Sequence, residues 1–205
     1  MPRIDDYKAS RDLAAAALDE RPFDQVAAAS GFAKAGEGVL RVPFLNRVYL
    51  VSAPGYTFAD EADAAKEVPL QEQVLILHYL MADPAVSPVG DWAAYREIPG
   101  ATFYFSAFTK RAIDPLIKVF GENVAGLVRA APAVGGVLVP GLGDAAFDFA
   151  IFPRVPLRMV LYAGDDEFPA GANILFDRTA GALLSPEDLA WLAGMPVYRM
   201  MAFAR

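Results

Sequence analysis

The sequence predicts an α+β fold, with a mainly antiparallel sheet and flanking helices in a single domain. Apolar residues recur at helical spacing in PLQEQVLILHYLM and alternate with more polar ones in AFDFAIFPRVPLRMVLYAG. The chain shows no regular strand–helix alternation of the kind that builds a parallel sheet. With 205 residues, 55% of them hydrophobic, and a mean hydropathy of +0.30, the chain is long and apolar enough to bury a core. We predict a leading helical segment over residues 1–21 and a single α+β domain over residues 22–205.

The first part of the chain predicts a pair of Ala-rich helices over residues 6–19 and 22–30. Arg21-Pro22 separates them, because the residue before a proline disfavours the helical conformation. A glycine-bearing joint follows over residues 31–38. Two β-rich runs then flank Leu45-Asn46 and predict a hairpin.

Three further helices are indicated by spacing and by end signals. The strongest covers residues 69–82. Asp114-Pro115 supplies a start signal for a second helix that ends at Gly121. The segment SPED supplies another start near the C-terminus, with Gly194 as the expected end.

The alternating region predicts a second hairpin. With the loop at Phe152-Pro153-Arg154, Ile151 pairs with Val155, and Asp148 lies opposite Arg158 on the other face. A two-residue loop would break this match, since a shift of one residue moves every side chain to the opposite face.

Composition excludes several classes of function. The chain has no cysteine, which rules out disulfides, thiolate catalysis and iron–sulfur ligation by protein thiolates. A net charge of −7 and the lack of a Lys/Arg cluster argue against a nucleic-acid partner. No membrane-length apolar run and no signal-peptide pattern occur, so we expect a cytoplasmic protein without a membrane partner. No metal-binding motif is present, and the cofactor stays unknown.

The segment LYAGDDEFPAGANILFD raises a physical question, because three adjacent carboxylates repel one another. One interpretation is a solvated turn after a strand. The other is an extended segment in which Asp165 and Glu167 point to one side and Asp166 to the other, where the paired carboxylates would share a proton or receive a cation or an arginine.

Other polar residues stand on apolar segments. His78, the only histidine, lies on the predicted helix over residues 69–82; it is either a hydrogen-bonded core imidazole or a base or axial ligand. Arg96 and Glu97 precede a run of aromatics that includes Tyr104, which would line a flat ligand's pocket or form ordinary core. The glycines before Asp144 fit no phosphate-binding motif and favour a turn.

The residues also resemble a known family. EVPLQEQVLILHYL, YREIPGATFYFSAFTKRAIDPLIKVFG, the segment from GDAAFDF to NILFD and the closing LSPEDLAWL are similar, in order and spacing, to the domain-of-unknown-function 3786 family over about residues 22–193. The resemblance implies a protein of anaerobic bacteria or archaea, in a family sometimes joined to iron–sulfur segments and linked to corrinoid or one-carbon metabolism. This chain lacks the cysteine segment, so that role does not transfer. The resemblance implies that positions of the family pattern match the following residues of this chain: His78, Arg96, Glu97, Asp144, Pro153, Arg154, Asp165 and Glu167.

From these observations we hypothesise a polar ligand site. The acids after Gly164 would form one wall, Arg96 or Arg154 would close it, and the aromatics near Tyr104 would form its floor. The first expected function is a small-molecule-binding or accessory protein, for a tetrapyrrole or corrinoid with His78 as lower ligand. The alternatives are a carboxylate-based enzyme, with or without a metal ion, and an interaction subunit for a redox protein partner.

Overall fold

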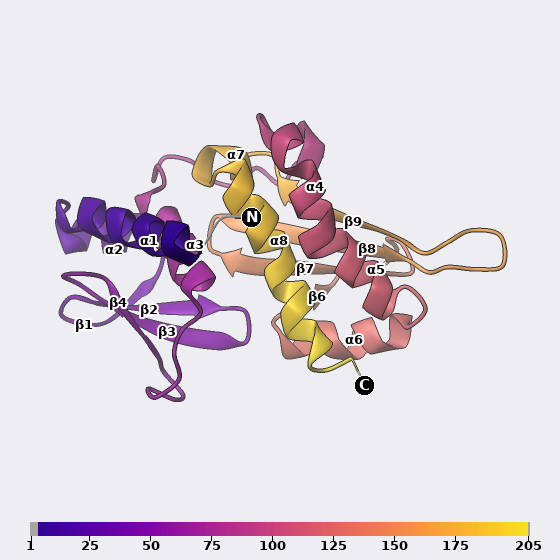
Figure 1. The fold of residues 1–205 in the computed structure, drawn as a ribbon, viewed down its shortest axis with the longest axis horizontal. Helices are drawn as coiled ribbons and strands as arrows, with labels where there is room; N and C mark the ends of the chain where they lie inside the picture. The colour runs from indigo at the N-terminus through magenta and orange to yellow at the C-terminus, as the bar shows by residue number, and fades with distance from the viewer. Residues whose placement is uncertain (1–3, 205) are drawn as a thin grey trace. The chain divides into compact units, whose positions relative to one another are not determined.

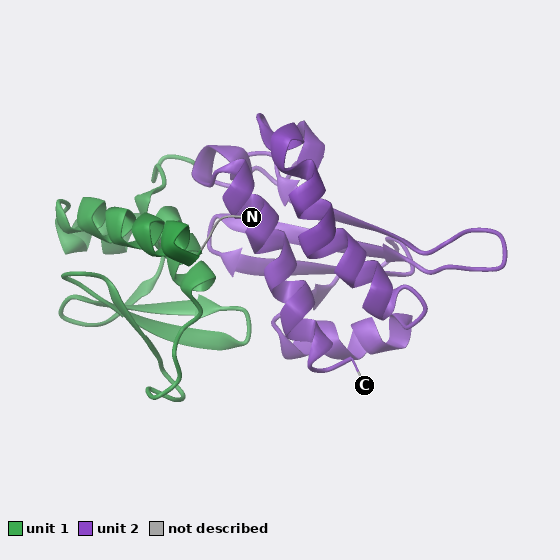
Figure 2. Ribbon diagram, in the orientation of Figure 1, with its two compact units in different colours: residues 1–86 green, residues 87–205 purple. Residues whose placement is uncertain are grey.

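The computed structural model describes residues 4–204 and confirms the α+β class, with two antiparallel sheets (Figure 1). Its contacts divide the chain into two compact units, residues 1–86 and residues 87–205 (Figure 2). Each unit contains its own sheet and its own helices. We describe them separately.

Unit 1 combines three helices with a four-stranded sheet. The sheet has the order β1-β2-β3-β4, and every neighbouring pair is antiparallel. Figure 2 shows the helices over one face of this sheet. In chain order the elements are α1 (Ile4–Asp19), α2 (Phe23–Ser30), β1 (Ala33–Gly36), β2 (Val39–Phe44), β3 (Arg47–Ser52), β4 (Thr57–Asp60) and α3 (Leu70–Met81).

The core of unit 1 follows from strand alternation. In β2 the side chains of Leu40, Val42 and Phe44 are fully buried, while those between them face outward. Tyr49 of β3 donates its hydroxyl to the buried carboxylate of Glu72 on α3 at 2.5 Å, which joins the sheet to the helix layer. The predicted hairpin is confirmed, with Leu45-Asn46 as its turn.

Unit 2 has a five-stranded antiparallel sheet of order β5-β9-β8-β7-β6. Its helices form a layer that crosses the sheet in Figure 1. The strands are β5 (Trp92–Ala94), β6 (Val137–Leu138), β7 (Ala145–Phe152), β8 (Val155–Tyr162) and β9 (Gly171–Asp177). The α-helices are α4 (Phe105–Phe108), α5 (Asp114–Phe120), α6 (Val124–Ala133), α7 (Ala180–Leu183) and α8 (Pro186–Met201), with short 3-10 helices at Tyr95–Glu97 and Ala101–Tyr104 and a π-helical segment at Thr109–Ile113.

The β7–β8 hairpin contains the predicted Asp148–Arg158 pair, but its turn differs from the predicted one. The turn has two residues, Pro153 and Arg154, and Phe152 rather than Ile151 pairs with Val155. A bulge between Ala150 and Phe152 absorbs the extra residue, so the register at Asp148 is unchanged. Arg158 donates Nε and Nη2 to the two Asp148 carboxylate oxygens at 2.7 and 2.8 Å.

One predicted helix end, one predicted N-cap and one joint differ in the structure. α5 spans Asp114–Phe120 with Gly121 as its C-cap, as predicted, but Asp114 is not an N-cap, because the π-helical segment runs directly into α5. Gly194 does not end α8, which continues to Met201. The joint over residues 31–38 contains the edge strand β1.

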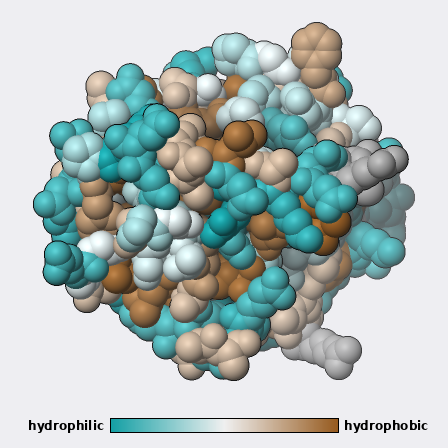
Figure 3. All heavy atoms as spheres, turned by 60° about the vertical axis from the view of Figure 1, so that its left-hand side comes forward, coloured by the Kyte–Doolittle hydropathy of each residue, from teal (hydrophilic) through white to brown (hydrophobic). Residues whose placement is uncertain are grey.

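The molecular surface mixes polar and apolar residues. Figure 3 shows hydrophilic and hydrophobic side chains interspersed over the face that it draws. No helix among the described residues is both long and apolar enough to cross a membrane.

Candidate functional site

The acid-rich segment borders a hollow of unit 2 with a volume of about 890 Å³. One wall comes from the end of α5 and the turn that leads to α6. The other wall comes from the loop between β8 and β9. The lining residues are Ile117, Lys118, Val119, Gly121, Glu122, Asn123, Gly164, Asp165, Asp166, Phe168, Pro169 and Ala170.

The loop is held by the first acid of the triplet. The Asp165 carboxylate accepts hydrogen bonds from the backbone N–H groups of Glu167 and Phe168 at 2.9 and 2.7 Å. The Asp165 N–H donates to the Phe168 carbonyl at 2.9 Å and closes the turn. These backbone donors, Phe168 first and then Glu167, lower the Asp165 pKa from its usual value. The turn interpretation is therefore confirmed, and the segment is not extended.

The two walls approach each other through glycines. The Gly164 N–H donates to the Gly121 carbonyl at 3.3 Å. A Cβ atom on Gly121 would lie 2.6 Å from the Ile117 carbonyl oxygen and 2.7 Å from the Ala170 Cβ atom. Gly121 therefore permits the close contact that shapes this hollow.

Most charged side chains in the lining of the hollow are acidic. Asp165, Asp166 and Glu122 contribute carboxylates, and Lys118 contributes one ammonium group. Asp166, Glu122 and Lys118 are exposed and make no hydrogen bond or ion pair with the described residues. These three charges are available to a ligand. Phe168, with 67% of its surface exposed, adds an aromatic ring to the rim.

Asp144 lies at the same end of the sheet as Asp165 but does not line the hollow. Its carboxylate accepts the Ala163 N–H at 2.7 Å, and its own N–H donates to the Leu161 carbonyl. Asp144 thereby fixes the point where the chain leaves β8. Glu167 is also absent from the lining, and its backbone N–H donates to the Asp165 carboxylate.

The two arginines proposed to close the site are not in the lining either. Arg154 lies in the β7–β8 turn, at the opposite end of β8 from Asp165. Eight residues of strand at about 3.3 Å each separate the two ends. Arg96 stacks its guanidinium on the Phe105 ring, 3.6 Å from the ring centroid.

Glu97 and Tyr104 belong to the same short helical region as Arg96. The Glu97 carboxylate accepts the Ala94 N–H at 2.6 Å and so stabilises the first 3-10 turn. Tyr104 is exposed at the surface. Beside them, Tyr95 is buried and stacks on Phe108 with ring centroids 4.2 Å apart. Tyr95 and Phe108 lie outside the predicted aromatic run, of which Phe103 and Tyr104 are both exposed.

His78 belongs to unit 1, on α3, while all the other predicted site residues belong to unit 2. Its Nε2 atom lies 3.1 Å from the Ser10 hydroxyl of α1. The imidazole therefore joins two packed helices through a hydrogen bond, as one interpretation predicts, but it is half-buried rather than buried in the core.

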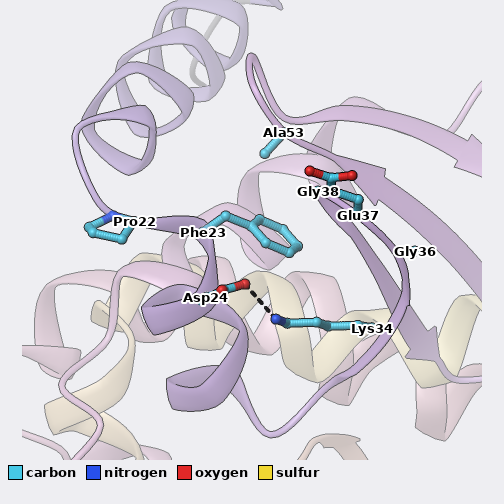
Figure 4. Close-up of a pocket in the computed structure, with 8 residues that line it drawn as sticks. All are labelled: Pro22, Phe23, Asp24, Lys34, Gly36, Glu37, Gly38 and Ala53. Atoms are coloured by element: carbon cyan, nitrogen blue, oxygen red, sulfur yellow. Dashed lines mark hydrogen bonds and ion pairs between the residues drawn. The ribbon is translucent and has the colours of Figure 1, made fainter.

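A second hollow, in unit 1, was missed from the sequence. It has a volume of about 660 Å³ and lies between the start of α2 and the β1–β2 hairpin (Figure 4). Its lining residues are Pro22, Phe23, Asp24, Lys34, Gly36, Glu37, Gly38 and Ala53. The sequence signal for it is the glycine-bearing segment around Glu37, which by itself indicates only a joint.

The described residues contain no group of three or more His, Cys, Asp or Glu side chains placed to hold a metal ion. The acids of the unit 2 hollow therefore do not form such a group. What they offer is a set of separate negative charges around an open space.

The family is decided by a match over most of the chain. The model of the domain of unknown function DUF3786 matches residues 22–199. The chain belongs to the DUF3786 family. No curated protein and no solved structure matches this DUF3786 chain. The match begins after α1 and includes residues of both units, so both hollows contain residues of the family domain.

Proposed function

We propose that this DUF3786 chain is a small-molecule-binding protein, and that the hollow beside Asp165 receives a small organic cation such as a polyamine. The observation that carries the proposal is the hollow itself. Its volume of about 890 Å³ is within the usual range for small-molecule sites. Carboxylates outnumber cationic groups in its lining.

The electrostatics of the hollow favour a positive ligand. Asp166 and Glu122 have no ion-pair partner among the described residues, so neither must give up a partner when a ligand binds. The hollow also adjoins the C-terminal end of α5, where backbone carbonyls add partial negative charge. Lys118 is the one opposing charge, and it would lower the affinity for a cation.

A flexible amine suits this lining better than a metal ion does. The carboxylates are separate, whereas a hard cation needs several oxygen ligands at close range. An amine with several charges along an apolar chain would reach Asp166 and Glu122 in turn, and its methylene groups would contact Phe168. This ligand class replaces the tetrapyrrole or corrinoid, which has less support because the Ser10 hydroxyl already engages Nε2 of His78.

The test is a calorimetric titration of the full chain with spermidine at low ionic strength. Asp166→Asn should weaken binding about two- to fivefold, the range for a solvent-exposed ion pair. Lys118→Gln should strengthen binding by a similar factor, because it removes a like charge. Raising the salt concentration should weaken binding in the wild type.

The matched control is Glu167→Gln, which removes the same charge from the adjacent residue outside the lining. It should bind spermidine nearly as well as the wild type. Equal losses in Asp166→Asn and Glu167→Gln would show only a general effect of surface charge, and the proposal would then be wrong. Absence of spermidine binding would also contradict it.

A further inference from the structure

We infer that unit 1 contains a second ligand site, a groove for a dipeptide-sized zwitterion with an apolar body. The groove joins the hollow of about 660 Å³ to a neighbouring hollow of about 220 Å³. Both are lined by Phe23, Gly38 and Ala53, so they are adjoining parts of one depression. The inference is independent of the unit 2 hollow.

The walls of the groove are held by backbone hydrogen bonds. The Ala53 N–H donates to the Gly38 carbonyl at 2.8 Å and fastens the β3–β4 turn to the β1–β2 turn. Gly38 has a φ of +68°, and a Cβ atom there would lie 2.9 Å from the Ala53 oxygen, so glycine is required for this approach.

The end of α1 is tied to the same turn. Both carboxylate oxygens of Asp19 accept the Gly55 N–H, at 3.0 and 2.9 Å. Arg11 of α1 donates to the Tyr56 carbonyl at 3.0 Å. The wall built from the turns is therefore preformed, which reduces the entropy lost when a ligand binds.

An aromatic ring lies at the centre of the groove. Figure 4 shows Phe23 pointing into the hollow, with Glu37 on one side of it and the Asp24–Lys34 pair on the other. The Lys34 ammonium binds Asp24 at 2.5 Å and links β1 to α2. Phe23 is only partly buried, and its exposed surface offers an apolar contact to a ligand.

Charged side chains of opposite sign line the two hollows. Glu37 lines the larger hollow and makes no hydrogen bond or ion pair with the described residues. Arg21 lines the smaller hollow, and its guanidinium donates a long hydrogen bond of 3.4 Å from Nη1 to the Met81 carbonyl. An ammonium group would pair with Glu37 and a carboxylate with Arg21, since Arg binds carboxylates through two parallel donors.

Phe23 lines both hollows and therefore favours a ligand with an apolar body between its charged groups. The ligand's charges must be separated by an apolar body that covers the ring. A dipeptide meets this condition, because its terminal charges are about 7 Å apart when extended and a side chain is free to contact Phe23.

The test is a calorimetric titration of the full chain with alanyl-phenylalanine, its N-acetyl form and its C-terminal amide. We expect the unmodified dipeptide to bind at millimolar or better affinity and each modified form to bind several-fold more weakly. In Glu37→Gln, the unmodified dipeptide should bind no better than its N-acetyl form. In Arg21→Gln, it should bind no better than its C-terminal amide. Phe23→Leu should weaken all three ligands about threefold to tenfold.

Glu67→Gln is the matched control, since Glu67 is exposed in unit 1 and does not line the groove. Equal binding of the three peptides, or unchanged binding in both Glu37→Gln and Arg21→Gln, would overturn the inference. So would failure to bind at about 5 mM peptide. The spermidine titration uses a different hollow in the other unit, so either proposal can fail alone. The two surface variants keep the test valid even if Phe23→Leu does not fold.

Discussion

At the scale of single residues, some carboxylates in this protein stabilise turns while others have no partner among the described residues. Asp165 accepts two backbone N–H groups of its own loop, while the adjacent Asp166 has no partner among the described residues. The triplet therefore contains a structural acid next to an unpaired one. Their adjacency is tolerated because the first is neutralised in part by backbone dipoles.

Substitutions at Asp165 should separate its hydrogen-bonding role from its charge. Asp165→Asn keeps an acceptor oxygen and should preserve the turn. Asp165→Ala removes the acceptor, and the Glu167 and Phe168 amides should then exchange with solvent roughly threefold to tenfold faster. Hydrogen exchange followed by NMR measures this. Equal exchange in the Ala and Asn variants would contradict the role of the acceptor.

Acidification gives a second measurement on the same residue. The folded pKa of Asp165 lies below its unfolded value, which is about 3.9. Its contribution to loop stability is therefore complete above that value and is lost as the pH falls through the lowered folded pKa. Protection of the Glu167 and Phe168 amides should persist at pH 4. Loss of protection near pH 5 would disagree with the lowered pKa.

Asp177 also accepts hydrogen bonds from backbone N–H groups, but it is buried. Burial raises its pKa, but hydrogen bonds from Thr179, Gly90 and Val89 outweigh burial and lower the pKa overall. Asp177→Ala would leave these donors unpaired, and we expect a loss of about 2 to 4 kcal/mol in the free energy of unfolding. Asp177→Asn, which keeps one acceptor, should lose less. Urea unfolding would test the order, and an Ala variant as stable as the wild type would contradict it.

At the scale of elements, glycines allow helices to pack closely in unit 2. Gly194 lies inside α8, where glycine is unfavourable relative to alanine. A Cβ atom there would lie 2.7 Å from the Arg111 carbonyl oxygen of the π-helical segment. At the same contact, the Arg111 guanidinium lies 4.0 Å from the centroid of the Trp191 ring. Close packing therefore explains why a glycine does not end this helix.

Gly194→Ala should destabilise the protein although it raises helix propensity. The added methyl group must push α8 away from the π-helical segment, which costs about 1 to 3 kcal/mol. Gly36→Ala is the matched control, because a Cβ atom at Gly36 would meet nothing within 4 Å. Thermal unfolding compares the two. A Gly194→Ala variant as stable as the control would show that the contact relaxes without cost.

At the scale of the whole molecule, the chain contains two compact units, each with its own sheet and buried residues. The proposed amine site lies in unit 2 and the proposed peptide groove in unit 1. Because each site is built within one unit, ligand binding at one does not require residues of the other.

Each unit should fold without the other. We expect the fragment of residues 87–205 to give dispersed amide NMR signals and a cooperative unfolding transition, since its hairpins and α8 bury a core within the fragment. It should also retain spermidine binding. A disordered fragment would show instead that the two units fold only together. That outcome would agree with the sequence prediction of a single domain over residues 22–205.

The sequence by itself determined the α+β class, the two hairpins and the helix over residues 69–82, because hydrophobic period and turn residues act locally. It also placed Asp148 opposite Arg158. Only the tertiary structure decided that helical turns lead directly into α5 before Asp114 and that α8 continues past Gly194, since neighbouring segments override local end signals. The same holds for the two hollows. The acid triplet singles out Asp165 in the sequence, but contacts between distant segments place Lys118, Glu122, Phe23 and Glu37 in the linings, and such contacts leave no local pattern.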